Sequence, residues 1–366
     1  TAGGNFESLV TTDTSTVTVV DTIDTTSVSL TAAPDLTEDG GNLTYTATLG
    51  SPVLAGDDPV VVSFTDLNGA ARSITITGGN ATGTYVATIP EALYEDVYSE
   101  AAADITIATN VSVAGGNFEA LGTPSVGTIA LTDSIDNTNA TLTSVGSGDE
   151  DSGSITYTVT LNNAPQADQL FSITLSNGQS ATITVASGAL TGAITFGWGA
   201  GAIAGTQALT GYPNSDAYSE APVDLSVSTF TASGAGGNFE QLTPINSSTP
   251  VTIADTITPT TITLSDVNGA EGTSHTITAT VDHVVTGNDL VITLSNGKEI
   301  TIAVGATSGT SAAFAIQSDD VYVDGDAYSV GISGTAGGNF ESLVTTDTST
   351  VTVSDTLDAV TAVLTV

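Results

Sequence analysis

The sequence predicts an all-β protein made of tandem immunoglobulin-like β-sandwich repeats. Three observations predict it: a recurring segment, dense strand patterning and regularly placed Asn-Gly turns. The first nineteen residues, TAGGNFESLVTTDTSTVTV, return unchanged at residues 335–353. The Asn of GGNFE stands at Asn5, Asn117, Asn238 and Asn339, at spacings of 112, 121 and 101 residues. Each spacing is the size of one small domain, so the chain is an array.

Each repeat is expected to contain seven strands. In the first repeat, β-branched residues recur in near-alternation in VSLTA, LTYTATL, VVVSFT, SITIT, TYVATI, DITIA and VGTIALTD. The pairs Asn68-Gly69, Asn177-Gly178 and Asn296-Gly297 fall between the third and fourth strands of the three repeats. Asn-Gly favours the tight type I′ turn of a β-hairpin. This pattern is typical of an immunoglobulin-like, cadherin-like sandwich.

Repeat boundaries are predicted at the short motifs DTID, DSID, DTIT and DTLD that follow each seventh strand. Linkers this short cannot act as flexible tethers, so we expect neighbouring repeats to be held nearly in line as an extended rod. The chain is expected to be a piece of a longer array. The expected divisions are a last-strand segment of a preceding repeat (1–24), repeat 1 (25–136), repeat 2 (137–258), repeat 3 (259–358) and the first strand of a following repeat (359–366).

Repeat 2 is longer than the others because of a Gly-rich, apolar stretch at about residues 196–212. This stretch holds the single tryptophan of the chain, Trp198. A hairpin that covers the sandwich is the favoured interpretation. The alternative is a stacking site for a sugar ring.

The charge of the chain is strongly negative. Forty acidic residues stand against Arg72 and Lys298, which gives a net charge of −38. Nucleic acid is excluded as a partner, because phosphate contacts need a basic surface. The mutual repulsion must be relieved by salt or bound cations, although an acidic surface could also serve solubility alone. There is no cysteine, and no apolar run long enough for membrane insertion is evident.

Strand alternation predicts where the acidic loops lie. Loops after strands one, three and five share the end of a repeat that carries the outgoing linker, and the other loops lie at the opposite end. Carboxylates should therefore converge at each junction. The first set is Glu38, Asp39, Glu95, Asp96, Asp133 and Asp136, facing Asp168 and Glu240; the second is Glu150, Asp151, Asp216 and Asp255, facing Asp289 and Glu341; the third is Glu271, Asp324, Asp326, Asp355 and Asp358; Asp21, Asp24 and Glu119 are the candidates at the preceding linker.

Calcium is the predicted ligand of these sets, because it takes six to eight hard oxygen ligands and no Lys or Arg is near in sequence. Thr258 replaces the second linker Asp between repeats 2 and 3. The sequence therefore predicts a weaker site at that junction. The alternative is that the loops are acidic only because they are exposed to solvent.

No catalytic constellation is evident, so the chain is not expected to be an enzyme, and no organic cofactor is expected. His275 and His283 lie eight residues apart on one strand, where a solvated face is the favoured interpretation. Asp282 is expected on the opposite face from His283, which argues against a Ser-His-Asp arrangement.

The combination of GGNFE, the V-T-V-x-D-T-I-D linker, the Glu-Asp-Gly-Gly loop before TYTATL and the LSNG turn resembles the extender repeats of large bacterial adhesins of the RTX and LapA type, which include ice-binding adhesins. The resemblance implies a calcium-rigidified stalk, exported to the bacterial cell surface, that projects a distal ligand-binding domain for adhesion or biofilm formation. Its partners would be neighbouring repeats of the same chain. Two alternatives stay open: a subunit of a self-assembling extracellular filament or surface layer, and a glycan-binding module that uses the Trp198 loop.

Overall fold

The structure is a computed structural model that describes residues 3–202, 204–212, 215–234 and 236–365. The chain forms two compact units. Unit 1 contains the residues up to Thr138 together with Asn238–Leu242, and unit 2 contains Asn139–Gly237 and the residues from Thr243 onward. Among the described residues, no helix is long and apolar enough to cross a membrane.

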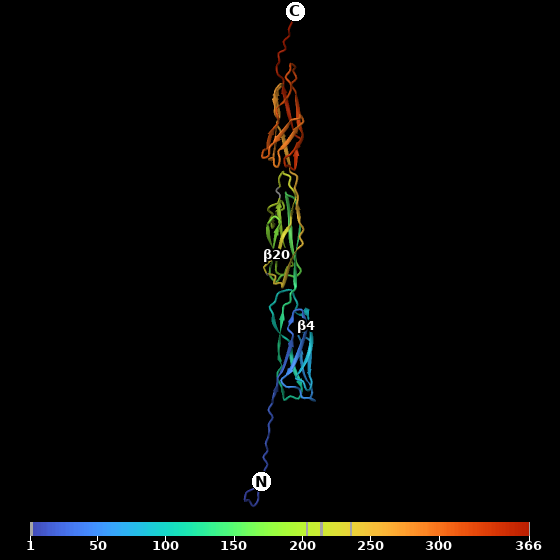
Figure 1. Ribbon diagram of the computed structural model, residues 1–366, viewed down its shortest axis with the longest axis vertical. Coiled ribbons are helices and arrows are strands. Elements are labelled where there is room, and N and C mark those ends of the chain that lie inside the picture. Colours follow the sequence, from blue (N-terminus) through green and yellow to red (C-terminus); the bar gives the residue numbers. More distant parts are fainter. Residues whose placement is uncertain (1–2, 203, 213–214, 235, 366) are drawn as a thin grey trace. The chain divides into compact units, whose positions relative to one another are not determined.

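Repeat 1, in unit 1, is a sandwich of two main sheets (Figure 1). One sheet has the order β11-β2-β4-β3-β12-β8, with β7 also paired to β4, and the other has the order β6-β5-β9; β1 and β10 form a separate pair. The elements are β1 (Thr25–Thr26), β2 (Val28–Ala33), β3 (Leu36–Thr37), β4 (Gly40–Leu49), β5 (Val60–Thr65), β6 (Ala71–Ile76), β7 (Thr82–Pro90), the 3-10 turn η1 (Glu91–Leu93), β8 (Ala103–Thr106), β9 (Thr109–Gly115), β10 (Ala120–Leu121), β11 (Ser125–Val126) and β12 (Thr128–Thr132).

Alternation along these strands builds the core of repeat 1. On β4, Leu43, Tyr45 and Ala47 point inward and are fully buried, while the intervening residues are partly exposed. The buried Tyr45 hydroxyl donates to the Ile107 carbonyl (3.1 Å) and accepts the Leu67 N–H (3.2 Å), which satisfies its polar atom inside the core.

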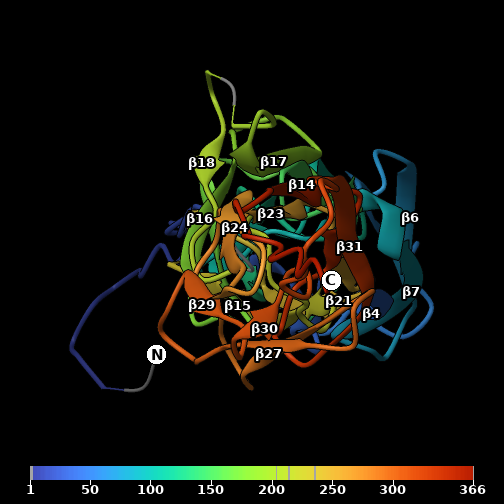
Figure 2. The same cartoon turned by 90° about the horizontal axis from the view of Figure 1, so that it is seen from above.

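Repeat 2 has the sheets β18-β17-β14-β13-β21 and β16-β15-β20, with β19 paired to β22. In the end-on view of Figure 2, β14 and β17 lie close to β18. The strands are β13 (Asn137–Gly148), β14 (Ser152–Leu161), β15 (Gln169–Leu175), β16 (Ser180–Val185), β17 (Thr191–Gly199), β18 (Gln207–Ala208), β19 (Val223–Leu225), β20 (Val227–Ser233), β21 (Gln241–Asn246) and β22 (Val251–Ile253).

The insertion of repeat 2 extends the sandwich, and Trp198 is part of the core. Trp198 lies on β17, is 1% exposed and donates from Nε1 to the Asp149 carbonyl at 2.6 Å. Its ring lies against Gly153, where an added Cβ would come within 2.1 Å of the indole, and 5.8 Å from the Tyr212 ring. The alternative of a sugar-stacking site on Trp198 is wrong, because the ring has no exposed face.

Repeat 3 has the sheets β29-β26-β23-β32 and β24-β33-β31-β27-β28, with β25 paired to β30. The strands are β23 (Pro259–Leu264), β24 (Val267–Ala270), β25 (Ser274–His275), β26 (Thr278–Val281), β27 (Leu290–Leu294), β28 (Glu299–Ile302), β29 (Ser308–Thr310), β30 (Phe314–Ala315), β31 (Ala327–Ala336), β32 (Ser342–Val344) and β33 (Thr348–Ser354). Asp282 and His283, expected on opposite faces, lie just beyond β26, and their side chains approach within 3.1 Å.

These sheets confirm an all-β chain of tandem immunoglobulin-like sandwiches. The first and last strands of a repeat pair in parallel, as β2 with β11, β3 with β12 and β24 with β33 show. This pairing brings the loop that follows the first strand to the place where the last strand ends. Acidic residues of the first loop and of the linker therefore meet.

Candidate metal centre

Four carboxylates gather at one pole of unit 1. One oxygen from each of Glu38, Glu100, Asp133 and Glu240 lies within 4.8 Å of the others. Glu240 belongs to the segment Asn238–Leu242, which is part of unit 1 although its sequence lies in repeat 2.

Backbone hydrogen bonds fix this arrangement. The Glu38 N–H donates to the Thr132 carbonyl (3.1 Å), which places the first-loop glutamate beside the linker. Asp133 Oδ2 accepts the Glu100 N–H (3.2 Å), and Glu240 Oε2 accepts the Asp136 N–H. Asp133 and Glu240 thus each use one oxygen to accept a backbone N–H, and their other oxygen is buried without a hydrogen-bond partner.

Unit 2 repeats the same construction with Glu150, Asp255 and Glu341, whose oxygens also lie within 4.8 Å of one another. The Glu150 N–H donates to the Ala254 carbonyl (2.9 Å), and Asp255 Oδ2 accepts the Glu220 N–H (3.0 Å). Glu341 Oε2 accepts the Thr258 N–H, as Glu240 does with Asp136. Position 258 therefore contributes its backbone, so the threonine does not remove a member of this cluster.

A third group, Glu271, Asp324 and Asp355, lies at the far pole of repeat 3. The Glu271 N–H donates to the Ser354 carbonyl (3.0 Å), the counterpart of the Glu38 and Glu150 bonds. Glu271 Oε1 accepts both the N–H and the hydroxyl of Thr356, each at 2.9 Å.

Most of these carboxylates, and the neighbouring Glu95, have one oxygen that is buried without a hydrogen-bond donor; the exposed Glu100 and Asp324 do not. Burial of a charged oxygen without a partner costs several kcal/mol, so most buried polar atoms are satisfied. Here the unsatisfied atoms recur at equivalent places. They are Glu38 Oε2, Glu95 Oε1, Asp133 Oδ1 and Glu240 Oε1 in unit 1, and Glu150 Oε2, Asp255 Oδ1, Glu341 Oε1, Glu271 Oε2 and Asp355 Oδ1 in unit 2.

The mutual repulsion appears in the proton affinities of the clustered acids. Burial, followed by the charges of Asp133 and Glu100, raises the pKa of Glu38 to about 7. A carboxyl–carboxyl hydrogen bond with Asp136, followed by burial, raises the pKa of Glu95 to about 7. Burial is also the first cause that raises the pKa of Glu100, Glu220, Glu240, Glu341 and Asp324.

Glu271 is the exception. Hydrogen bonds from the Thr356 N–H and hydroxyl lower its pKa, because they stabilise the ionised form. Asp358 lies near this group, where the charge of Asp319 raises its pKa.

Several predicted ligands support the loops instead of joining a cluster. Asp96 and Asp216 accept the N–H of Tyr98 (2.7 Å) and Tyr218 (2.8 Å), although their charges still reach the neighbouring glutamates. Glu95, Asp136 and Asp358 also lie outside the clusters. Three more such side chains are Asp39, exposed beside the Thr37 hydroxyl, Asp151, which accepts from Ser215, and Asp326, which accepts the Ala327 N–H.

The carboxylates at the preceding linker form no cluster among the described residues. Asp21 and Asp24 are exposed, and the Asp24 N–H donates to Glu119 Oε2 at 2.5 Å. This bond corresponds to those of Glu240 and Glu341, so the GGNFE glutamate keeps its role in all three repeats.

Asp168 and Asp289, expected to face the junctions, act within their own repeats. Asp168 accepts the Ser187 N–H, and Asp289 accepts the Val304 N–H, each at 2.9 Å. Both carboxylates therefore stabilise local turns.

Glu100 and Glu220 are the acids that the strand-alternation argument did not find. Both end the tripeptide Tyr-Ser-Glu, at residues 98–100 and 218–220. The recurrence of that tripeptide, ahead of the sixth strand, is the signal that could have identified them.

The donor set of each cluster suits a hard divalent cation. All potential ligands are carboxylate oxygens, with no sulfur or imidazole, which favours calcium or magnesium over zinc or copper. Of the two basic residues, Arg72 pairs with Asp66 at 2.8 Å and Lys298 lies in the β27–β28 turn, so neither neutralises a cluster.

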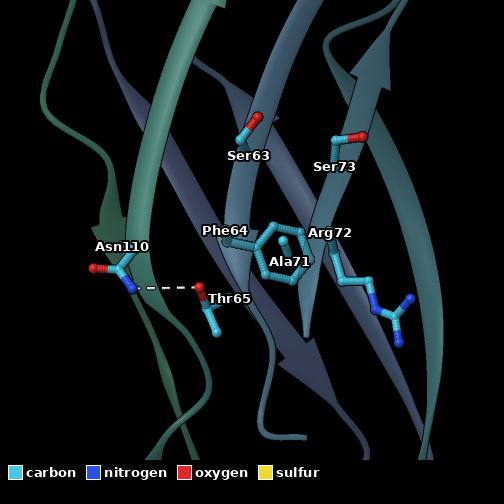
Figure 3. Close-up of a pocket in the computed structure, with 7 residues that line it drawn as sticks. All are labelled: Ser63, Phe64, Thr65, Ala71, Arg72, Ser73 and Asn110. Atoms are coloured by element: carbon cyan, nitrogen blue, oxygen red, sulfur yellow. Dashed lines mark hydrogen bonds between the residues drawn. The ribbon is translucent and has the colours of Figure 1, made fainter. Parts of the chain in front are cut away.

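A separate concavity of about 370 Å³ lies on repeat 1 between β5, β6 and β9 (Figure 3). Figure 3 shows Asn110 bonded to Thr65 (3.3 Å) on one side and Arg72 on the other. The Arg72 guanidinium lies 5.2 Å from the Tyr85 ring and pairs with Asp66, so its charge is already engaged.

Comparison with known proteins identifies the family of the chain. No curated protein matches the chain. Among solved structures, the I9–I11 tandem of titin aligns at 12% identity over 92% of this chain and 98% of that one, with a TM-score of 0.19. An Escherichia coli alpha-2-macroglobulin activated by porcine elastase aligns at 10% identity over 90% of this chain and 30% of that one, with a TM-score of 0.18. The family model of the LapA domain matches three times, over residues 24–134, 136–256 and 258–356, and the chain therefore belongs to the LapA domain family.

Proposed function

We propose that the chain is a stalk segment of a large bacterial surface adhesin, in which calcium stiffens the junctions between repeats. The stalk would hold a distal ligand-binding domain away from the cell surface. Three consecutive LapA domains support the role of an extender, as does the nineteen-residue identity between residues 1–19 and 335–353. Duplication of this kind lengthens a protein without adding new chemistry.

The observation that carries the calcium proposal is the recurrence of buried, unsatisfied carboxylate oxygens. They stand on equivalent residues, such as Glu38, Glu150 and Glu271, and face other carboxylates within 4.8 Å. Without a cation these groups destabilise the fold through desolvation and repulsion. A bound calcium ion would coordinate the unsatisfied oxygens and neutralise the repulsion between the carboxylates, because it takes six to eight oxygen ligands, including water.

The linkage to stiffness follows from which residues contribute. Glu240 and Asp133 belong to successive repeats in sequence, as do Glu341 and Asp255. An ion that binds both would tie a loop of one repeat to the linker of the previous one. Loss of the ion would leave like charges opposed and would loosen the junction.

Two measurements on the full chain test the proposal. Calorimetric titration should detect saturable calcium binding, with magnesium as the control ion, since its small octahedral shell fits a multi-carboxylate site less well. Small-angle scattering should give a longer maximum dimension and a more uniform ensemble in calcium than in chelator. Identical scattering profiles in the two conditions, or no heat of calcium binding, would contradict the proposal.

A further inference from the structure

An apolar pocket of about 310 Å³ opens at the pole of repeat 1 that faces away from its carboxylate cluster. It is lined by Ser51, Pro52, Leu54, Asp57, Asn117 and Phe118. Leu54 is 66% exposed there. Asp57 Oδ2, at the edge of the pocket, is buried without a hydrogen-bond partner. Asn117 and Phe118 are the Asn-Phe of GGNFE.

The equivalent place in repeat 3 is filled by a tyrosine. The Tyr218 ring stacks on Phe340 with centroids 5.8 Å apart, and its hydroxyl donates to the Val284 carbonyl at 2.8 Å. Two backbone bonds flank the ring: the Ser219 N–H donates to the Asn339 carbonyl (3.0 Å) and the Glu341 N–H to the Ala217 carbonyl (3.2 Å).

Val284 corresponds to Pro52 of the pocket. Each precedes a buried valine whose carbonyl accepts a glycine N–H, Gly79 to Val53 at 2.7 Å and Gly305 to Val285 at 2.9 Å. The pocket therefore holds the counterparts of the two groups that contact Tyr218, a GGNFE phenylalanine (Phe118) and the loop residue Pro52 at the place of Val284.

Unit 1 contains a second filled example. Tyr98 stacks on Phe239 at 5.8 Å, and the Ser99 N–H donates to the Asn238 carbonyl at 2.8 Å. The same contact therefore occurs twice: a tyrosine from the Asp-x-Tyr turn of one repeat stacks on the GGNFE phenylalanine of the next repeat.

Repeat 3 presents a third tyrosine of this type. Asp320 Oδ1 accepts the Tyr322 N–H at 2.8 Å, as Asp96 and Asp216 do for Tyr98 and Tyr218. Tyr322 is 72% exposed and Val323 is 89% exposed. The turn is formed, and its aromatic ring is uncovered.

We infer that the Phe118 pocket is a docking socket for a tyrosine segment of the repeat-3 type, residues 320–324. The sequence supports this occupant, because residues 1–19, which precede repeat 1, are identical to residues 335–353 of repeat 3. The Tyr322 ring stacks on Phe118, and its hydroxyl donates to the Pro52 carbonyl. A second copy of this chain offers the same segment in trans and serves as the probe.

The chain has no cysteine, so disulfide trapping between two full-length variants is specific. Asn117→Cys in one chain and Val323→Cys in the other occupy the positions that Asn339 and Ser219 hold in the filled junction. Oxidation of an equimolar mixture in calcium should give the mixed disulfide about tenfold faster than a mixture of Val323→Cys with Leu190→Cys, an exposed site elsewhere. Tenfold is the factor that 1.4 kcal/mol of aromatic stacking provides. Tyr322→Ala in the Val323→Cys chain should remove the excess.

A single chain that carries Ser219→Cys and Asn339→Cys is the positive control, since these residues already face each other. Analytical ultracentrifugation of the unsubstituted chain and of the Phe118→Ala variant tests the contact without cysteines. The apparent molecular mass should rise with protein concentration for the unsubstituted chain and stay constant for Phe118→Ala. Equal trapping rates for Asn117→Cys and Leu190→Cys, or association that Phe118→Ala leaves unchanged, would overturn the inference. This inference is independent of the calcium proposal. If the chain binds no calcium but the disulfide trapping still depends on Tyr322, only the calcium proposal is refuted.

Discussion

Substitution of Glu38 by glutamine should change the stability of repeat 1 in opposite directions with and without calcium. In the metal-free protein the pKa of Glu38 rises from 4.5 to about 7. An acid whose pKa is raised on folding destabilises the fold progressively as the pH rises from the unfolded-state pKa to the folded-state pKa, and by the full amount above the latter. At 1.36 kcal/mol per unit the ceiling is about 3 kcal/mol. Water reaches the cluster beside the exposed Glu100, and screening reduces the effect to about 1–2 kcal/mol. In chelator at pH 8, Glu38→Gln should therefore stabilise the repeat by about that amount.

In calcium the sign reverses. A site at a hundredfold excess of ion over its dissociation constant contributes about 2.7 kcal/mol to folding. Glutamine offers only a neutral oxygen, and a tenfold loss of affinity removes about 1.4 kcal/mol. Glu38→Gln should thus destabilise the repeat when calcium is present.

Hydrogen exchange resolved by segment is the appropriate assay, because a multidomain chain does not unfold in one transition. The informative amides are those of Glu38 and of the last strand near Thr132. Glu91→Gln removes the same charge from an exposed residue of the same repeat, outside the cluster, and is the matched control. A change of equal sign in calcium and in chelator, or one that Glu91→Gln reproduces, would refute the reasoning.

Three further outcomes are expected. In chelator the chain should lose stability as the pH rises from about 4.5 to about 7, because the raised pKa values of Glu38 and Glu95 make the folded state hold protons that the unfolded state has released; melting that is flat or improves over this window would contradict the assignment. Trp198→Ala should destabilise repeat 2 by about 3–5 kcal/mol. Gly153→Ala should destabilise it by about 1–3 kcal/mol through overpacking and should increase the quenching of tryptophan fluorescence by iodide. Unchanged quenching in Gly153→Ala would argue against the buried ring. Asp136→Thr should lower the pKa of Glu95 by removing their hydrogen bond, which carboxyl NMR would detect; an unaltered titration would count against that contact.

The architecture could be predicted because β-sandwich physics is local. Alternation identifies the buried face of strands such as β4, and the Asn-Gly pairs mark the positions of the hairpins. The type I′ conformation expected for these pairs is wrong, because only the glycines Gly69, Gly178 and Gly297 have a positive φ and the preceding asparagines do not. Strand direction then explains why Glu38, Asp133 and Glu240 share a pole.

The remaining site features depend on hydrogen bonds that no periodicity encodes. Asp168 and Asp136 lie in loops at the same poles as the clustered acids. However, Asp168 accepts the N–H of a turn residue, and Asp136 is hydrogen-bonded to Glu95. Glu100 was missed because the segment between η1 and β8 has no strand pattern. Trp198 could not be placed from sequence, since a Gly-rich stretch is compatible with either a surface loop or a close approach between strands.

The parallel pairing of first and last strands has a mechanical consequence. A pulling force transmitted along the chain enters a repeat at its first strand and leaves at its last, so it loads the β2–β11, β3–β12 and β24–β33 hydrogen bonds along the strand axis. Bonds loaded in shear must fail together, whereas the antiparallel hairpins would unzip one pair at a time. The Glu38–Thr132 and Glu271–Ser354 bonds extend this shear-loaded patch to its very end. When the chain is pulled from its ends, the rate at which these patches rupture, and not the equilibrium stability of the sandwich, sets how long each repeat stays folded.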